Sequence, residues 1–310
     1  MKTLLPTAAL TVAAAFACVT ATAPVTAAPA SAQPYRVMLD WFFNPDHGPL
    51  LVADALGYFD AAGLEVTLIE PADPTAPPFQ VAAGDGDIAI SYQPDFHLLT
   101  DQGLDIEWVG TIVGSPLNSL VVAGDGPIQS MADLQGQRIG YSVEGFQTAL
   151  VDTMLGTAGL GLDDVELINV NFALSPSIYA GQVVAAIGAF RNFELNQMEL
   201  DGEPGRVFLP EDFGVPSYAE LIFVTNPQSA ESAATQAFLA AVQKGAEAIA
   251  ADPVGTFDLF IQGREALLDT PLNRKAWQDT APLLSTQVIG YDTAQFAEMD
   301  AYMTAAGLIE

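Results

Sequence analysis

Short apolar runs that are typical of strands alternate with stretches of helical periodicity over the first two thirds of the chain. The predicted strands are residues 35–39, 64–69, 87–91, 106–113, 120–122, 138–141, 165–170, 183–187 and 221–225. Within 64–69 (LEVTLI), apolar residues recur at every second position, as on a half-buried strand. Apolar residues at helical spacing separate the strands, most clearly at 49–55 and 147–158. This alternation predicts an α/β protein with mainly parallel sheets.

The last third of the chain, from residue 228 to residue 310, is predicted to be almost entirely helical. Between residues 232 and 250, one helical face carries the apolar residues Phe238, Val242, Ala246 and Ile249. Two strand–helix series, separated near 124–127, and the helical tail together predict two lobes. The first lobe comprises 33–126 and 226–310, and the second comprises 127–225. A ligand cleft is expected between the lobes, where strand ends and helix N-termini meet.

The first 32 residues have the pattern of a secretory signal peptide. Met1-Lys2 is followed by an apolar stretch from Leu4 to Thr20, and Ala30-Ser31-Ala32 is an A-x-A cleavage site. We predict cleavage after Ala32 and a periplasmic location. A lipoprotein-like pattern around Cys18 leaves lipid anchoring open as an alternative. No later segment has the roughly 20 uncharged apolar residues that a membrane span requires.

The amino-acid composition excludes some classes of binding partner. Half of the 310 residues are apolar, and 38 acidic against 9 basic residues give a formal net charge of −29. The apolar content argues against intrinsic disorder in spite of the charge. Nucleic acid and anionic membrane are unsuitable partners, because both need Lys and Arg to neutralise phosphate. Removal of the signal peptide would also remove Cys18, which excludes disulfides, thiolate metal sites and a Cys nucleophile in the mature chain.

Few residues suited to catalysis remain. The mature chain has two histidines, His47 and His97, and two lysines, Lys244 and Lys275, both in the helical tail. Phosphate-binding loops, zinc-protease motifs and nucleophile elbows are absent from the sequence. The run 84–87 (GDGD) lacks the further oxygen ligands of a calcium loop and is predicted to be a turn. We therefore expect no cofactor, no metal site and no enzymatic activity.

Aromatic and polar residues gather where predicted strands end. Residues 40–48 (DWFFNPDHG) follow the first strand, and comparable segments follow later strands at 91–93, 114–118, 145–148 and 190–194. Three adjacent aromatics in a loop are costly to expose, so Trp41 and its neighbours either pack inward to close the lobe or clamp a flat ligand. Asn118 and Phe146 belong to the same set of strand-end residues and are candidates for the ligand site.

Motifs spaced over the whole of residues 35–310 resemble those of a known family. Residues 39–66 (LDWFFNPDHGPLLVADALGYFDAAGLEV) match its opening pattern, LDW-x-x-N-x-x-H followed by a helix and GYF. Further matches follow in order: DIAISYQ (87–93), PLNSLV (116–121), DLQGQRIGY (133–141), IGAFRNFELNQM (187–198) and GVPSYAELIFVTN (214–226). The chain thereby resembles the ThiY-type periplasmic binding proteins of the SsuA/THI5-like superfamily, which carry pyrimidine precursors of thiamine to an ABC transporter. The resemblance implies a type II periplasmic-binding-protein fold, with two lobes joined by two crossover strands.

The resemblance also implies the ligand-binding residues. The family's pocket motifs correspond here to Trp41, Asn44, His47, Tyr92, Asn192, Phe193 and Glu194, and Tyr218 in GVPSY is expected near the same site. The aromatic residues among them are expected to stack on the faces of a flat aminopyrimidine ring. Glu194 is expected to accept from an exocyclic amino group as a charged carboxylate, with Asn44 or Asn192 on a ring nitrogen.

Alternatives to a pyrimidine receptor stay open at this stage. Relatives with similar openings bind riboflavin or alkyl sulfonates, and Arg191 beside the expected pocket suits an anionic or phosphorylated ligand. A related enzyme on this scaffold makes the pyrimidine from its own His and bound pyridoxal phosphate, but its Cys-rich motif has no counterpart here. The resemblance favours a monomeric receptor that closes around a small flat heterocycle and then meets an ABC permease and its ATPase.

Overall fold

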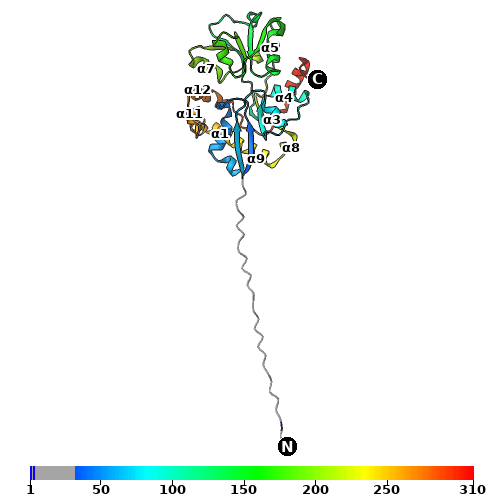
Figure 1. The fold of residues 1–310 in the computed structure, drawn as a ribbon, viewed down its shortest axis with the longest axis vertical. Helices are drawn as coiled ribbons and strands as arrows, with labels where there is room; N and C mark the ends of the chain where they lie inside the picture. The colour runs from blue at the N-terminus through cyan, green and yellow to red at the C-terminus, as the bar shows by residue number, and fades with distance from the viewer. Residues whose placement is uncertain (2, 4–31) are drawn as a thin grey trace. The chain divides into compact units, whose positions relative to one another are not determined.

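The computed structural model describes residues 1, 3 and 32–310, and residues 32–310 form one compact unit (Figure 1). The predicted signal peptide, with Cys18, falls almost entirely outside the described residues. The folded unit opens with strand β1 at Gln33, the residue that follows the predicted cleavage site. Among the described residues, no helix is long and apolar enough to cross a bilayer.

Two five-stranded sheets form the framework of this unit. The first has the order β2-β1-β3-β10-β4, built from β1 Gln33–Met38, β2 Leu64–Ile69, β3 Ile88–Ser91, β4 Glu107–Val113 and β10 Leu221–Thr225. The second has the order β7-β6-β8-β5-β9, built from β5 Asn118–Ala123, β6 Arg138–Tyr141, β7 Glu166–Asn169, β8 Ala185–Phe190 and β9 Gly205–Phe208. In each sheet three strands pair in parallel and one strand, β10 or β5, runs antiparallel to both its neighbours. The predicted α/β class is confirmed.

The chain passes between the sheets twice. It leaves the first sheet through residues 114–117, between β4 and β5, and returns through residues 209–220, between β9 and β10. Strand β5 therefore pairs in the second sheet, whereas the predicted first lobe extends to residue 126. The turn at 124–127 does not separate the lobes, because Gly124 N–H donates to the Pro204 carbonyl beside β9. A buried apolar strand such as β5 carries no local mark of the sheet in which it pairs.

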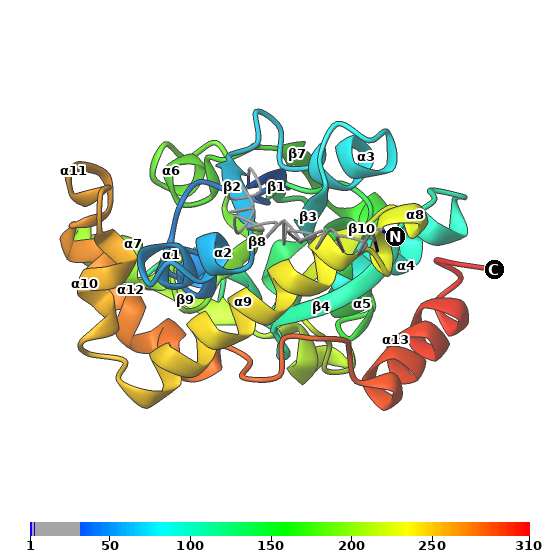
Figure 2. The same ribbon diagram turned by 90° about the horizontal axis from the view of Figure 1, so that it is seen from below.

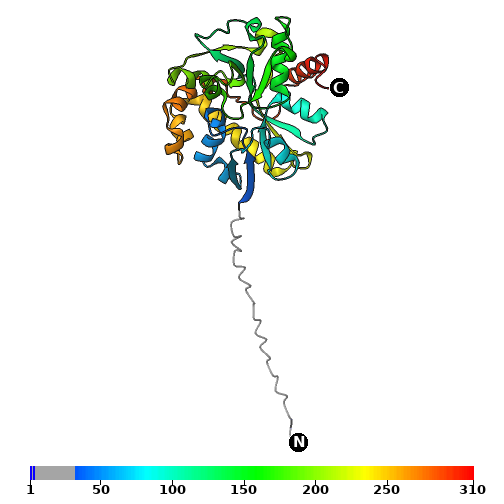
Figure 3. The same cartoon turned by 45° about the horizontal axis from the view of Figure 1, so that its top comes forward.

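Helices cover both sheets. Those before the return to the first sheet are α1 Gly48–Ala55, α2 Tyr58–Ala61, α3 Pro77–Ala82, α4 Gln93–Asp101, α5 Phe146–Gly156, α6 Leu174–Tyr179 and α7 Glu194–Leu200. The helical tail is confirmed as α8 Pro227–Ala230, α9 Ala233–Ala251, α10 Thr256–Ile261, α11 Glu265–Leu268, α12 Pro271–Thr280 and α13 Thr293–Ala305. Short 3₁₀ turns are η1 Pro45–His47, η2 Met131–Leu134, η3 Leu162–Asp164, η4 Pro210–Phe213 and η5 Ala281–Leu283. In Figures 1 and 3, α10–α12 (orange) and α13 (red) lie at opposite sides of the unit.

Helix α9 packs against α1 and α2 beside the first sheet (Figure 2). Its predicted apolar face is buried, namely Phe238, Val242, Ala246 and Ile249. Gly245 lies where α1 comes closest, and a Cβ atom at this position would lie 2.2 Å from the Pro49 carbonyl oxygen. Only glycine therefore allows the two helices to approach this closely.

We expect Gly245→Ala to destabilise the protein by about 1–3 kcal/mol, because the added methyl group meets backbone that cannot turn aside. Gly156→Ala is the matched control. Gly156 is the last residue of α5, and a Cβ atom there meets nothing within 4 Å, so the same change should leave the stability equal or raise it by about 0.5–1 kcal/mol. Urea unfolding of both variants measures the difference. Equal stability of the two variants would contradict the close packing of α1 and α9.

Candidate functional site

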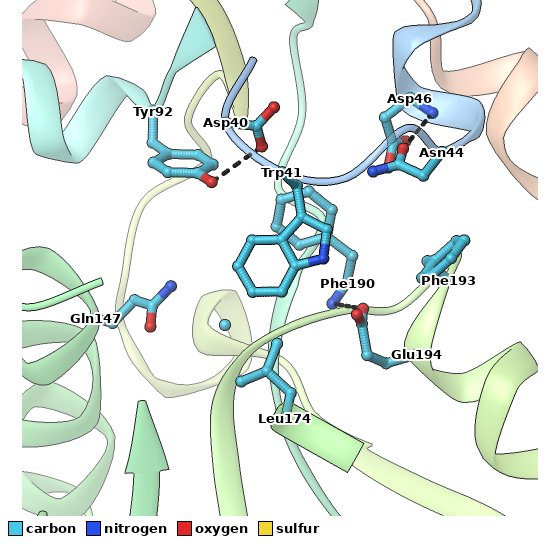
Figure 4. A pocket seen from close by; sticks show the side chains of 11 residues that line it. Asp40, Trp41, Asn44, Asp46, Tyr92, Gln147, Leu174, Phe190, Phe193 and Glu194 are labelled. Carbon is cyan, nitrogen blue, oxygen red and sulfur yellow. Dashed lines mark hydrogen bonds between the residues drawn. The ribbon is translucent and has the colours of Figure 1, made fainter. Parts of the chain in front are cut away.

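A cavity with about 380 Å³ of empty space, part of it open to solvent, lies between segments that follow the strands of both sheets (Figure 4). The first lobe contributes Asp40, Trp41, Asn44, Asp46 and Tyr92, and the second contributes Gln147, Leu174, Gly188, Phe190, Phe193 and Glu194. Of the predicted site residues, the cavity is lined by Trp41, Asn44, Tyr92, Phe193 and Glu194. The remaining predicted residues lie behind its walls.

Two buried side chains fix Asp40 at the cavity wall. Its Oδ1 accepts a hydrogen bond from His47 Nε2 at 3.0 Å, and its Oδ2 accepts one from the Tyr92 hydroxyl at 3.0 Å. His47 Nδ1 accepts the backbone N–H of Asn44 at 3.3 Å, which assigns the ring proton to Nε2. His47 is fully buried and does not line the cavity. It therefore positions Asp40 and makes no direct contact with the cavity, contrary to the prediction.

The loop after β1 turns into η1 and brings Asp46 to the cavity. Asn44 caps this turn, since its Oδ1 accepts the Asp46 N–H at 2.8 Å and its Nδ2 donates to the Phe42 carbonyl at 3.1 Å. The Asn44 amide thus lines the cavity with both of its polar atoms already engaged by the loop. Its main contribution is the shape of the loop.

Asn192 ties the second lobe to this loop. Its Nδ2 donates to Asp46 Oδ1 and to Thr280 Oγ1, each at 2.8 Å. The side chain is buried away from the cavity, so the expected contact with a ring nitrogen is replaced by a bond between lobes. Asp46 Oδ2 has no hydrogen-bond partner in the described part of the protein. Burial raises the pKa of Asp46 to about 7, although the Asn192 hydrogen bond opposes the shift.

Glu194 is the second carboxyl group of the cavity. Its Oε2 accepts the Phe190 N–H at 2.6 Å. Burial raises the pKa of Glu194 to about 8; this backbone hydrogen bond opposes the shift, and the nearby Asp46 carboxyl adds to it. At neutral pH Glu194 is therefore largely protonated and offers both an O–H donor and a carbonyl acceptor. The sequence predicts a charged acceptor at this position, whereas the ligand-free cavity favours a neutral Glu194, because two carboxyl groups in one poorly hydrated cavity do not both ionise without cost.

Aromatic rings make up much of the remaining wall. Trp41 and Tyr92 come from the first lobe, and Phe190 and Phe193 come from the second. The predicted residue Phe146 is buried behind Tyr92, with ring centroids 5.3 Å apart, and supports that ring without lining the cavity. The cavity thus combines flat apolar faces with a few polar groups, as small-molecule sites do.

Gly188 makes room for a polar group in the wall. It has a φ of 99°, and a Cβ atom there would lie 2.6 Å from Gln147 Nε2. Gln147 Oε1 accepts the N–H groups of Ser142 and Val143 at 2.9 and 3.0 Å. The amide oxygen is thereby fixed, and Figure 4 shows the nitrogen turned toward the cavity.

Asn118 and Tyr218 lie at the crossover segments and do not line the cavity. Asn118 Oδ1 accepts the Gly188 N–H at 2.9 Å, and Tyr218 is fully buried. Beside them, Glu220 Oε2 accepts the N–H groups of Leu117 and Asn118 at 2.7 and 2.8 Å. Both predicted residues therefore belong to the connection between the lobes.

Arg191 is also committed to this connection. It donates to both carboxylate oxygens of Glu211, at 2.6 and 3.1 Å, and to the carbonyls of Leu117 and Asn118, at 3.2 and 2.9 Å. It does not line the cavity. Arg191, the candidate for binding an anionic ligand, therefore already forms its hydrogen bonds with groups of the protein.

Several cavity residues were missed by the sequence patterns: Asp40, Asp46, Gln147, Leu174, Gly188 and Phe190. The two Asp residues and Gln147 lie within the predicted strand-end segments. The sequence therefore located their segments but not the direction in which their side chains point. Leu174 and Gly188 carry no local signal, because apolar and glycine residues are common throughout the chain. Among the described residues, no group of three or more His, Cys, Asp and Glu is arranged to bind a metal ion.

Comparison with known proteins places the sequence among thiamine-related proteins. A family model described as NMT1/THI5 like matches residues 44–256. A thiamine biosynthesis protein of Haemophilus influenzae is 46% identical over 273 residues, which cover 88% of this chain and 87% of that protein. A formylaminopyrimidine-binding protein of Halalkalibacterium halodurans is 30% identical, over 89% of this chain and 86% of its own. A 4-amino-5-hydroxymethyl-2-methylpyrimidine phosphate synthase of Legionella pneumophila is 28% identical, over 83% and 81%.

Comparison with solved structures identifies the fold. The alkanesulfonate-binding protein SsuA of Xanthomonas axonopodis pv. citri, bound to MOPS, superposes with a TM-score of 0.71 over 91% of this chain and 96% of its own. The sequence identity is 16%, so the likeness concerns the fold alone. The predicted periplasmic-binding-protein fold is confirmed.

We expect the ligand-free protein to lose stability as the pH rises from about 4.5 to about 8. Glu194 has its ordinary pKa of 4.5 when unfolded and a pKa of about 8 when folded, so in this range the folded state keeps a proton that the unfolded state releases. Each such group lowers the free energy of unfolding by up to about 1.4 kcal/mol per pH unit. Glu194→Gln should flatten the decline, whereas Glu166→Gln, at an exposed position, should not. Urea unfolding at pH 5, 6.5 and 8 measures how the free energy of unfolding declines with pH. If Glu194→Gln declined as steeply as the unmodified protein, a protonated Glu194 would be contradicted.

Proposed function

The chain belongs to the NMT1/THI5-like family, and on that premise we propose that it is the solute-binding component of an ABC importer for a thiamine pyrimidine precursor, a hydroxymethyl- or formyl-aminopyrimidine. The observation that supports this best is the pairing of a neutral Glu194 with aromatic walls in one cavity. An aminopyrimidine is flat and has an amino donor beside a ring-nitrogen acceptor. A protonated carboxyl group offers the complementary acceptor and donor.

The remaining wall suits the same ligand. Trp41 and Phe193 supply faces on which a ring stacks, and the Gln147 amide nitrogen supplies a further donor. Asp46 Oδ2 is buried without a partner, and a ligand donor would relieve that cost. These groups come from both lobes, so a ligand that contacts them all favours the closed arrangement over an open one. The permease then meets the closed protein and its ATPase drives uptake.

The alternatives have less support from the cavity. An alkyl sulfonate or a phosphorylated ligand needs cationic donors, and no Lys or Arg lines this cavity. A Schiff-base enzyme needs a lysine at the site, whereas Lys275 pairs with Glu199 and Lys244 lies over the Tyr58 ring. We therefore propose a binding protein that has no enzymatic activity.

We expect the mature protein to bind hydroxymethyl-aminopyrimidine by calorimetry at pH 6.5, and not taurine or riboflavin. Glu194→Gln should keep the affinity within about threefold, because an amide offers the same donor and acceptor as a protonated carboxyl group. Glu194→Leu should weaken binding by about tenfold or more, since it removes both contacts. Glu199→Leu, at an exposed position of the same helix, is the control and should bind normally.

Two results would count against this assignment. Loss of binding in Glu194→Gln to the extent seen in Glu194→Leu would show that the ligand needs the charged carboxylate. Binding of taurine or riboflavin alone would leave the receptor role in place and reject the pyrimidine.

For location, we propose export to the periplasm with cleavage after Ala32. The intact mass of the protein from the periplasmic fraction should correspond to a chain that starts at Gln33. Ala32→Tyr should cause the precursor to accumulate, because the cleavage site requires a small residue there. Ser31→Tyr changes the unconstrained middle position of A-x-A and is the matched control. A lipid-modified mass that starts at Cys18 would overturn this assignment in favour of a lipoprotein.

A further inference from the structure

A second, outer cavity adjoins the one described above. It has about 580 Å³ of empty space, part of it open to solvent, and shares with the inner cavity the residues Trp41, Asn44, Leu174, Phe193 and Glu194. Its further walls are Phe42, Phe43, Phe172, Ser175, Pro176, Gln197 and Leu272. The five shared residues place the two cavities next to each other.

The outer cavity is largely aromatic and is formed by both lobes. Phe172, from the second lobe, packs against Trp41 and Phe42 of the first, with ring centroids 4.6 Å apart in each pair. Phe42 is 47% exposed, which is costly for a large apolar side chain at the rim of a cavity. A flat group in this space would cover that surface and extend the aromatic contacts.

Polar groups in the outer cavity are few and include no cation. Ser175 Oγ is fully buried and has no hydrogen-bond partner within the described residues. Gln197 is half-buried on α7, and Glu194 faces both cavities. Neither cavity has a Lys or Arg among its lining residues, and the inner one contains the carboxyl groups of Asp40, Asp46 and Glu194.

This charge pattern separates two kinds of substituent. A phosphate would enter a poorly hydrated space with no cation to neutralise it, so the cost of removing its charge from water opposes binding. A neutral ring carries no charge, so its entry does not have this desolvation cost. A cationic ring gains, because the aromatic faces attract a positive charge.

We propose that the outer cavity is a second subsite, which takes a flat neutral or cationic ring carried on the methylene group of the pyrimidine, and that the two cavities together reject a phosphate at that position. This inference rests on the proposed function. It extends the ligand class from small pyrimidine precursors to pyrimidines that carry a second ring, of which thiamine is the available example.

The test compares three compounds that share one pyrimidine: the hydroxymethyl-aminopyrimidine, its phosphate ester and thiamine. By calorimetry at pH 6.5, thiamine should bind within about tenfold of the hydroxymethyl compound, and the phosphate ester should bind at least about a hundredfold more weakly. Failure of both the hydroxymethyl and the formyl compound to bind would reject the proposed function. If the hydroxymethyl compound binds and thiamine does not, the subsite alone is wrong. Tight binding of the phosphate ester would overturn the charge argument.

Variants that fill the outer cavity test whether the second ring of thiamine binds there. Gln197 lines only the outer cavity, so Gln197→Phe should weaken thiamine by about tenfold or more and leave the hydroxymethyl compound within about threefold. Leu200→Phe adds the same ring at an exposed position of the same helix that lines neither cavity; it is the control and should change neither affinity by more than about threefold. Leu272→Phe fills the same space from the first lobe and serves if Gln197→Phe does not fold. Equal weakening of both ligands in a folded, cavity-filling variant would contradict a separate subsite.

Discussion

The connection between the two sheets depends on a buried carboxyl group that belongs to one crossover and bonds to the other. Glu220, on the return segment, accepts the backbone N–H groups of Leu117 and Asn118 on the outgoing segment. Arg191 bonds to the carbonyls of the same two residues and to Glu211. Both faces of one short stretch of backbone are therefore held by side chains from other parts of the chain. The relative position of the sheets, and with it the shape of the cavity, follows from this arrangement.

The same crossover reaches the cavity wall through the backbone. Asn118 bonds to Gly188, whose positive φ and missing side chain leave room for the Gln147 amide. On the opposite side, Asn192 bonds to Asp46 and so joins the loop after β1 to the second lobe. Asn192, which the family resemblance implied as a ligand contact, thus binds the lobes to each other. Its identity matters to the site even though it does not line the cavity.

The cavity differs from the rest of this acidic protein in how its carboxyl groups are used. The 38 acidic residues outnumber the 9 basic residues, and most of them lie outside the cavity. Inside, burial raises the pKa values of Asp46 and Glu194 to about 7 and about 8. Two adjacent acids with raised pKa values give a site that is close to neutral at physiological pH. Such a site suits an uncharged polar heterocycle, and it becomes more hospitable to cations and less hospitable to anions as the pH rises.

The sequence by itself determined the alternation of strands and helices, the helical tail, the segment at 40–48 and the aromatic character of the site, because these depend on local periodicity and on residue type. It also marked Trp41, Tyr92, Phe193 and Glu194 through motif resemblance. Only the tertiary structure decided that β5 pairs in the second sheet, that His47 and Asn192 lie behind the wall, and that burial raises the pKa of Glu194. Pairing partners, side-chain direction and pKa all depend on neighbours that are distant in the chain, and no local pattern records them.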